Sequence, residues 1–487
     1  MFHEVFGGTV LAMSIRIHHG VCPSVVAVPR RGRRRSGVFA AIVAATLTGG
    51  TCLAGAAGAS PAVGGVPGAG ADPGGLKVLA GVDGLPAAGR DGTAGSPARE
   101  GASADDGPSP TSVPVQQAVD GVVAAGAVGA LARVRDGRGV VTAVAGQADR
   151  ATGRLLSADD QFEIGSNTKT MMATIVLQLV GEGRLRLTDS VEKLLPGVVP
   201  GGEGITVRML LQHTSGLYNY TDDPDLLKAF FQDPTARHSP EELVAGAMEH
   251  PALFEPGARW SYSNTNYLLV GMILQKVTGR SPDRLLQERI ARPLGLHRTY
   301  LVTHLAGDTG PGYAHGYFAT FTGSGSTPEI RYNDVSGWSL SWAWTAGAVV
   351  STAPELSRFL SALLGGELLP AARLADMLTT VPMDDDGGSG YGLGIARTRT
   401  PCGTVWGHTG GTVGHSSHMF GTAGGRRTVV TDSTTIPDGL DGPGATDRAR
   451  AMASADEALF LTGLCRMQGR DLPGDPVPSH APGTSGS

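Results

Sequence analysis

The stretch Phe162-Glu163-Ile164-Gly165-Ser166-Asn167-Thr168-Lys169 decides the fold of this chain. It leads into the segment Thr168 to Gly181, whose large apolar side chains recur at helical spacing and predict a buried helix. Lys169 follows Ser166 by nearly one helical turn, so both side chains lie on one face. A helix N-terminus favours a developing negative charge, and burial lowers the pKa of a lysine. Ser166 is therefore the candidate nucleophile, and Lys169 is the candidate base beside it.

The Ser-x-x-Lys spacing is not specific by itself, because it occurs again at Ser190-Val191-Glu192-Lys193. That second serine follows Thr188-Asp189 and precedes a charged segment that ends at a proline, a pattern typical of a solvated helix start. For Ser166 the corresponding alternative is a helix N-cap, with Lys169 turned to the solvent. Other motifs have to decide between the two interpretations.

A second motif, Trp260-Ser261-Tyr262-Ser263-Asn264, contains the one tyrosine of the chain that has an asparagine two places later. In extended backbone the side chains of Tyr262 and Asn264 point to one face. A phenol near cations can pass a proton between a nucleophile and a leaving group, and the Asn264 amide can hold both Lys169 and a substrate carbonyl. The motif follows the turn Pro256-Gly257, where functional residues are common. The alternative is a tyrosine packed beside a loop.

A third motif is Trp406-Gly407-His408-Thr409-Gly410-Gly411, in which strand residues are followed by glycines. Glycine in a strand lets a backbone or a ligand approach closely. The amide N–H groups of Gly411 and Ser166 are predicted to form an oxyanion hole. His408 would supply a positive charge opposite the nucleophile, because histidine titrates near neutral pH.

The charge distribution indicates an exported protein with a mildly acidic body. The net charge is −5, although the first 59 residues carry six arginines against one acidic residue. A basic run at 30–35, an apolar core at 38–47 and small residues at 57–59 are typical of a cleaved signal peptide. The alternative is an uncut membrane anchor through residues 38–59. An acidic body argues against a nucleic-acid partner.

The remaining chain divides by composition. Residues 60–113 are rich in Gly, Ala and Pro and predict a disordered linker, and residues 467–487 predict a disordered tail. Residues 114–466 are periodic and predict one α/β body with an inserted, mainly helical domain. The expected elements are helices at 115–125, 168–181, 355–364 and up to 461, with Thr446 as the last N-cap, strands at 128–134, 140–145, 344–352 and 404–432, and helices with loops over 186–300.

The remaining histidines and cysteines allow structural interpretations. His213 is read as structural, tying a helix end to a loop. His415 and His418 lack the glutamate of a zinc-binding helix, so no metal or other cofactor is expected. After signal cleavage only Cys402 and Cys465 remain, and an even count in an exported protein suggests one disulfide, the alternative being two separate thiols.

The three motifs, in this order, resemble the serine β-lactamase and penicillin-recognising DD-peptidase family, which is described by Ser-x-x-Lys and Lys-Thr-Gly motifs. The resemblance covers roughly residues 115–466. Tyr-x-Asn is similar to the class C branch, and His408-Thr409-Gly410 looks like the secreted D-alanyl-D-alanine carboxypeptidases of that branch. The placement of Cys402 and Cys465 also matches a disulfide in those enzymes. Further stretches that carry the resemblance are Leu210-Leu211-Gln212-His213-Thr214-Ser215-Gly216-Leu217 and Tyr391-Gly392-Leu393-Gly394.

The resemblance implies an antiparallel sheet flanked by helices, with the active site between the sheet body and the helical domain. It also implies acyl transfer through Ser166, with Lys169 or Tyr262 taking the proton, from a peptide that ends in D-Ala-D-Ala or from a β-lactam. The resemblance places Asn264, Thr409, Gly410 and Trp342 in substrate binding, with Arg397 or Arg399 as possible partners of a substrate carboxylate and ordinary core as the alternative for Trp342.

Several functions remain open within the same family. A β-lactamase, an esterase and a D-amino-acid amidase share the motifs, because cleft shape and not motif content selects the substrate. A non-catalytic penicillin-binding sensor is the alternative outside enzymes, and the complete set Ser166, Lys169, Tyr262 and His408 argues against it. We expect a monomer without a stable membrane partner.

Overall fold

The computed structural model describes residues 113–302, 312–322, 329–384, 387–438 and 447–470. The expected signal peptide, nearly all of the expected linker and the last residues of the expected tail lie outside the described residues, as does the predicted N-cap Thr446. In the described part of the chain, no helix is both long enough and apolar enough to cross a membrane.

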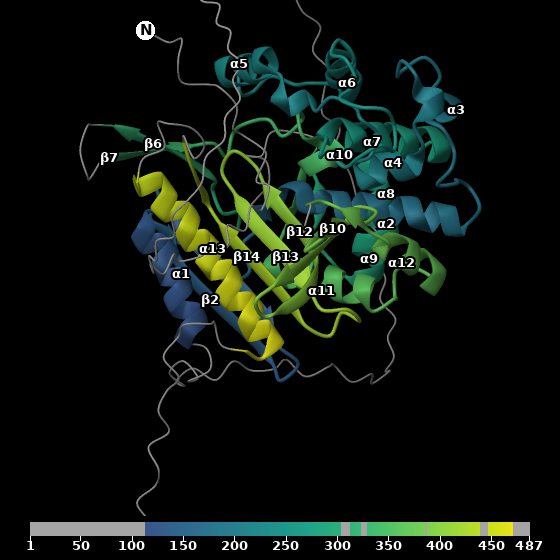
Figure 1. Cartoon of the computed structure of the whole chain (residues 1–487). Helices are drawn as coiled ribbons and strands as arrows, with labels where there is room; N and C mark the ends of the chain where they lie inside the picture. The colour runs from purple at the N-terminus through teal and green to yellow at the C-terminus, as the bar shows by residue number, and fades with distance from the viewer. Residues whose placement is uncertain (1–112, 303–311, 323–328, 385–386, 439–446, 471–487) are drawn as a thin grey trace, which may run out of the picture. The chain divides into compact units, whose positions relative to one another are not determined.

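A nine-stranded sheet is the central element, with the strand order β3-β2-β1-β14-β13-β12-β11-β10-β9. Its neighbouring strands pair antiparallel, and β1 pairs both with β2, as the sequence predicts, and with β14 from the far end of the chain (Figure 1). This confirms the predicted antiparallel sheet. The strands are β1 (Gly129–Arg135), β2 (Val140–Asp149), β3 (Arg154–Leu155), β9 (Val381–Pro382), β10 (Ser389–Tyr391), β11 (Ala396–Thr400), β12 (Gly403–Gly411), β13 (Ser416–Gly421) and β14 (Thr428–Ser433).

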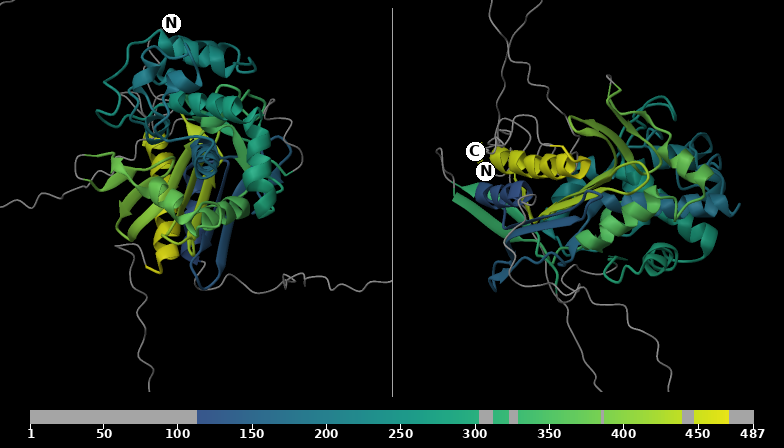
Figure 2. Two further views of the ribbon diagram at one scale, coloured as in Figure 1. Left: turned by 90° about the vertical axis from the view of Figure 1, so that its right-hand side faces the viewer. Right: turned by 90° about the horizontal axis from the view of Figure 1, so that it is seen from below.

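Two helices cover one face of this sheet. The first and last helices, α1 (Val113–Ala125) and α13 (Asp447–Gln468), lie side by side although they are far apart in sequence (Figure 2). Their apolar stripes are buried against side chains of β1 and β13, which removes apolar area from water and holds the two chain ends to the sheet. The buried residues of this layer include Val115, Val119, Val122, Val134, Phe420, Leu459 and Leu464.

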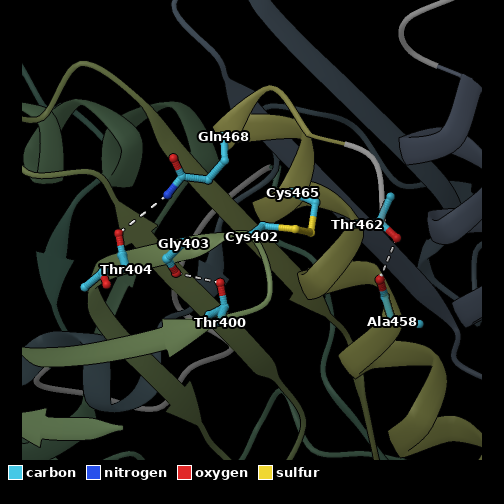
Figure 3. The surroundings of a disulfide bond; sticks show 8 residues. All are labelled: Thr400, Cys402, Gly403, Thr404, Ala458, Thr462, Cys465 and Gln468. Carbon is cyan, nitrogen blue, oxygen red and sulfur yellow. Dashed lines mark hydrogen bonds between the residues drawn. A yellow bond between two sulfur atoms is a disulfide. The ribbon is translucent and has the colours of Figure 1, made fainter. Parts of the chain in front are cut away.

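A disulfide links the same layer to the strand that carries the third motif. Cys402, just before β12, is joined to Cys465 of α13, with their Cα atoms 5.1 Å apart and a sequence separation of 63 (Figure 3). A crosslink that closes a loop of this length is worth roughly 4 kcal/mol in the chain-entropy model. It fixes the start of β12 against α13.

The other face of the sheet and the region beyond it are mainly helical. Between β4 (Phe162–Glu163) and β5 (Tyr300–Leu301), both paired with β8 (Val349–Ser351), the chain forms a run of helices, as the sequence predicts. The central one is α2 (Thr168–Gly181), which is buried from Thr168 to Leu177. The others are α3 (Val191–Leu194), α4 (Val207–Gln212), α5 (Pro224–Gln232), α6 (Pro240–Met248), α7 (Asn264–Thr278), α8 (Pro282–Leu286) and α9 (Arg292–Leu294).

The remaining described elements surround the large sheet. The helix α11 (Ala353–Leu364) packs against it on the face opposite α13, where a Cβ on Gly421 of β13 would lie 3.2 Å from Leu360. The remaining elements include α12 (Ala371–Leu378) and a small sheet of β6 (Tyr317–Thr322), β7 (Glu329–Asp334) and β15 (Thr435–Pro437).

Two predicted elements are wrong in part. The segment 344–352 was expected to be a strand, but it begins with the short helix α10 (Trp344–Gly347) and becomes β8 only at Val349. A short apolar run has no periodicity that separates a buried helical turn from a buried strand. The last helix runs to Gln468 rather than to Leu461, because Leu464 and Met467 still find apolar partners on the sheet. It therefore includes two residues, Met467 and Gln468, that the sequence placed in the tail.

Candidate active site

The turn before α2 is set by a close approach of two backbones. Gly165, Ser166 and Asn167 form one 3-10 turn, η1 (Gly165–Asn167), and Gly165 has a positive φ of +50°. A Cβ on Gly165 would lie 2.5 Å from the backbone nitrogen of Gly411, a distance that real Cβ atoms do not tolerate. Glycine at position 165 therefore lets the turn that carries Ser166 lie directly against the end of β12.

A glycine of β12, Gly410, also lies close to this turn. A Cβ on Gly410 would lie 2.0 Å from the carbonyl oxygen of Ile164. The Asn167 side chain donates to that carbonyl at 3.0 Å and to the Ser417 hydroxyl of β13 at 2.9 Å. Gly410 thus allows backbone to pack on backbone, and the Asn167 side chain stabilises the contact.

Ser166 lies where two proton-bearing groups converge. Its Oγ accepts hydrogen bonds from Lys169 Nζ at 2.9 Å and from the Tyr262 hydroxyl at 2.8 Å. The residue is 8% exposed, so it is shielded from most solvent. The alternative in which Ser166 caps a helix and Lys169 points to solvent is wrong, because Lys169 is completely buried and the N-caps of η1 and α2 are Ile164 and Asn167.

Lys169 is held by oxygen atoms that carry no charge. Besides Ser166 Oγ, its Nζ donates to Asn264 Oδ1 and to the Ala346 carbonyl, each at 2.7 Å. Burial lowers the pKa of Lys169 well below its ordinary value because the charged form has lost its water. These contacts hold the amine in one position, from which it can exchange a proton with Ser166.

Tyr262 is placed by the loop that enters α7. Lys169 Nζ lies 4.8 Å from the centroid of its ring. Burial raises the pKa of the Tyr262 phenol, and the hydrogen bond with Ser166 opposes this in part. Of the two candidate bases, Lys169 is therefore the one that burial pushes towards its proton-accepting form.

The prediction of a positive charge on His408 is wrong. The Tyr391 hydroxyl donates to its Nε2 at 2.8 Å, and its Nδ1 donates to the Thr409 carbonyl. The ring is 4% exposed, and burial together with the nearby Lys169 lowers the pKa of His408 to about 3. His408 is therefore neutral at physiological pH, chiefly because a buried imidazolium loses its hydration.

Two other predicted site residues, Gly411 and Thr409, have different surroundings. A Cβ added to Gly411 would meet no heavy atom within 4 Å, so this end of β12 borders open space. Thr409 is half-buried and pairs with His418, whose ring stacks on Phe460 of α13. Paired residues share a sheet face, so the Thr409 side chain lies on the opposite strand face from His408.

The contacts of Trp342 and of Arg397 lie outside the Ser166 group. Trp342 packs against Phe230 with ring centroids 5.7 Å apart and accepts a hydrogen bond from the Tyr220 hydroxyl at its carbonyl, which favours the ordinary-core alternative. Arg397 of β11 donates to the Gly387 carbonyl at 3.3 Å, and Arg399 is exposed.

Three supporting groups were missed by the sequence reasoning. They are the Ala346 carbonyl and the side chains of Asn219 and Thr221. Asn219 Oδ1 accepts from the Asn264 backbone N–H at 2.9 Å, and the Thr221 hydroxyl accepts from Asn264 Nδ2 at 3.1 Å. These two bonds fix the Asn264 amide so that its Oδ1 faces Lys169. No local pattern marks these residues, because their roles depend on contacts between distant segments.

The remaining histidines and the second Ser-x-x-Lys motif have structural places. His213 ends α4 with a positive φ of 59°, and its Nδ1 accepts from the Ser263 N–H, which confirms the structural interpretation. Ser190 caps α3 by accepting from the Lys193 N–H, as predicted. His415 Nδ1 lies 3.1 Å from Asp432 Oδ2. Among the residues that the structure describes, no group of three or more His, Cys, Asp or Glu side chains could hold a metal ion.

The fold and the convergence of the three motifs agree with comparison to known proteins. Residues 115–452 match the family model described as Beta-lactamase. The chain belongs to this family, which confirms the resemblance seen in the motifs. The match runs from α1 into α13 and therefore contains Ser166, Tyr262 and His408.

Individual relatives include proteins named as amidohydrolase, amidase and penicillin-binding protein. A D-stereospecific amidohydrolase from Streptomyces sp. has 38% sequence identity and a TM-score of 0.62, over 71% of this chain and 98% of that one. A D-amino acid amidase from Ochrobactrum anthropi SV3 has 27% identity and a TM-score of 0.62, over 72% of this chain and 98% of that one. Penicillin-binding protein 4* of Bacillus subtilis is 27% identical over 58% of this chain, and the match spans 63% of that protein, less than two thirds of its length.

Proposed function

We propose that this protein is a serine amidohydrolase that cleaves the amide bond following a D-amino-acid residue through an acyl-enzyme on Ser166. The observation that carries the proposal is the double hydrogen bond to Ser166 Oγ, from Lys169 Nζ at 2.9 Å and from the Tyr262 hydroxyl at 2.8 Å. The D-stereospecific amidohydrolase and D-amino acid amidase among its structural relatives support the substrate class.

In the acylation step, neutral Lys169 takes the Ser166 proton as Oγ forms a bond to the substrate carbonyl carbon. The backbone N–H groups of Ser166 and Gly411 stabilise the negative charge that develops on the carbonyl oxygen. Tyr262 gives its proton to the departing nitrogen and regains one from Lys169, so the C–N bond breaks with a neutral amine as leaving group. Water then attacks the ester, its proton returns through the same groups, and Ser166 is released with a carboxylic acid.

Cleavage of a terminal D-Ala-D-Ala bond, which the motifs led us to expect, is the second candidate. A relative from Escherichia coli (strain K12) named putative D-alanyl-D-alanine carboxypeptidase supports it, with 26% identity over 52% of this chain. This candidate needs a partner for the free carboxylate of the substrate, and His408, which is neutral in the ligand-free site, could provide a charge only if the bound carboxylate raised its pKa. The leaving group would then be a free amino acid rather than ammonia or a simple amine.

The proposal is tested by mass spectrometry and product analysis on the intact protein. A penicillin is expected to add its mass to a peptide that contains Ser166, and D-phenylalanine amide is expected to release ammonia while the L-enantiomer does not. A peptide that ends in D-Ala-D-Ala is assayed beside them for release of D-alanine. Ser166→Ala should abolish labelling and turnover, whereas Ser190→Ala, at the second Ser-x-x-Lys motif, should change neither.

The outcomes separate the candidate functions. Release of D-alanine without hydrolysis of the amide would favour the carboxypeptidase, and rapid turnover of the penicillin would favour a β-lactamase. Turnover of simple esters alone would indicate an esterase. A stable penicillin adduct with no turnover of any substrate would support the sensor and would overturn the proposed amidohydrolase.

We also propose that the chain is exported and that residues 114–466 form its functional domain. The basic and apolar segments at 30–59 support export, and the Cys402–Cys465 disulfide suits an oxidising compartment. N-terminal sequencing of the secreted protein should give a start after Ala59. Recovery of the uncut chain from the membrane fraction would instead support an anchor through residues 38–59.

A further inference from the structure

His213 holds the backbone on both sides of Tyr262. Its carbonyl oxygen accepts from the Ser261 N–H at 2.9 Å, and its Nδ1 accepts from the Ser263 N–H at 3.2 Å. One residue therefore bonds a backbone N–H of each neighbour of the tyrosine, Ser261 and Ser263. This double attachment restrains the backbone on both sides of Tyr262, beyond what a helix end requires.

The imidazole ring also supports the phenol directly. Its centroid lies 4.3 Å from that of Tyr262, with the rings inclined by 34°, and 4.9 Å from that of Tyr391, whose hydroxyl bonds His408. His213 is fully buried. It therefore lies between Tyr262 and Tyr391 of β10, the residue that bonds His408 of the third motif.

The hydrogen bonds define which nitrogen of His213 is the acceptor. The Asn266 side-chain amide points its Nδ2 at His213 Nδ1 at 3.2 Å, because the Asn266 Oδ1 accepts from the Ser215 hydroxyl at 2.6 Å. Two donors, the Ser263 N–H and the Asn266 amide, thus face Nδ1. A proton on Nδ1 would meet both donors, so the ring holds the Tyr262 loop only as the tautomer protonated at Nε2.

We propose that His213 is a positioning residue that aims the Tyr262 phenol at Ser166 and at the departing nitrogen. The inference rests on the proposed function, in which Tyr262 protonates the leaving group. An amine leaves only when it is protonated, whereas an activated phenolate leaves without a proton. Loss of the His213 acceptor should therefore slow hydrolysis of an amide far more than hydrolysis of a nitrophenyl ester of the same acyl group.

Two variants of His213 distinguish the loss of the Nδ1 acceptor from a change in backbone conformation. His213→Asn places an amide oxygen near the position of Nδ1 and tolerates the left-handed conformation, whereas His213→Gly adopts that conformation freely but lacks the acceptor. Thr206→Ala is the matched control, because it removes the N-cap of the same helix, α4, and touches no residue of the site.

The experiment compares kcat and KM for D-phenylalanine amide and for the nitrophenyl ester of an N-blocked D-phenylalanine, together with melting temperatures. For His213→Gly we expect kcat on the amide to fall about 100-fold, the lower end of what a positioned proton-transfer group contributes, with the ester changed less than about 3-fold. His213→Asn should recover most of the amide activity. Thr206→Ala should lower the melting temperature and leave the ratio of amide to ester activity unchanged.

Crystal structures of the variants test the positioning role without an activity assay. A crystal structure of His213→Gly should show the Tyr262 hydroxyl displaced from Ser166, and that of His213→Asn should retain the hydrogen bond. An unmoved Tyr262 in the glycine variant, or equal losses on amide and ester, would overturn the inference. If the wild-type protein hydrolysed no amide, the proposed function would fail, and the displacement of Tyr262 would still decide whether His213 positions it.

Discussion

At the scale of single residues, the site depends on the environment of one amine. The Lys169 ammonium has three oxygen partners, from Ser166, Asn264 and Ala346, and none of them is a carboxylate. A buried lysine without an anion loses solvation energy that its hydrogen bonds replace only in part. Such an amine can lose its proton at a pH well below the ordinary lysine pKa and act as a base there, which a solvent-exposed lysine cannot do.

The lowered pKa of Lys169 predicts the pH dependence of acylation. The acylation rate should rise with pH as Lys169 loses its proton, and it should level off well below the ordinary lysine value of 10.5, because burial lowers the pKa. Single-turnover rates measured from pH 5 to pH 10 test this with the wild-type protein. Lys169→Met should lose at least 100-fold in rate, with Lys193→Met as the matched control. A half-maximal rate near pH 10.5 in the wild type would contradict the assignment of the base.

At the scale of elements, two adjacent glycines of β12 have different surroundings. The Gly410 backbone lies against Ile164, where an added Cβ would come within 2.0 Å of the carbonyl oxygen, whereas a Cβ on Gly411 would meet no heavy atom within 4 Å. The first glycine allows β12 to pack on η1. The second leaves space at the opening where the substrate carbonyl is proposed to lie.

The two glycines therefore predict opposite effects of alanine on stability. Gly410→Ala should push β12 away from η1 and lower the free energy of unfolding by about 1–3 kcal/mol, as overpacking does, with a large loss of acylation rate. Gly411→Ala should change the free energy of unfolding by less than about 0.5 kcal/mol. Urea unfolding of both variants measures this difference. Equal stabilities would mean that the close contact with Ile164 does not constrain the strand.

The same elements show which features local sequence could predict. The helix α2, the hairpin β1–β2 and the position of Ser166 and Lys169 followed from periodicity and spacing within short segments. The helical turn α10 did not, although its Ala346 carbonyl is one of the partners of Lys169. Its conformation depends on α2 and α7, which are distant in sequence, and such tertiary contacts override local preference.

The state of His408 shows the same limit for chemistry. The sequence correctly placed His408 on the strand of the third motif, but it could not show that Tyr391 donates to the ring or that Lys169 lies close enough to lower its pKa. A pKa depends on burial and on neighbouring charges, and both are set by the fold. Residue types therefore identified the site, and the protonation states had to come from the structure.

At the scale of the whole molecule, a buried acidic residue, Asp456, connects the helix α13 to the sheet. Asp456 accepts from the Ser416 hydroxyl of β13 at 2.8 Å and is 6% exposed. Burial raises the pKa of Asp456 to about 7, and the nearby Asp432 adds to this, while the bond from Ser416 opposes it. The layer that holds both chain ends thus contains a carboxyl group that the folded protein prefers to keep protonated.

This carboxyl group predicts how the stability of the whole protein depends on pH. The folded pKa of about 7 lies above the ordinary aspartate value of 3.8, so the contribution of Asp456 to stability is fully present below pH 4 and is lost as pH rises to about 7. One pKa unit corresponds to 1.36 kcal/mol, which gives an upper value of about 4 kcal/mol.

The variant Asp456→Asn tests this contribution. It keeps an oxygen acceptor for Ser416 and cannot ionise, so its stability relative to the wild type should rise from pH 4 to pH 7 and stay constant above that. Urea unfolding between pH 4 and pH 9, with the disulfide intact, measures this difference, and Asp447→Asn on the exposed first turn of α13 is the control. A difference that does not change with pH would mean that Asp456 ionises in the folded protein as readily as in the unfolded chain.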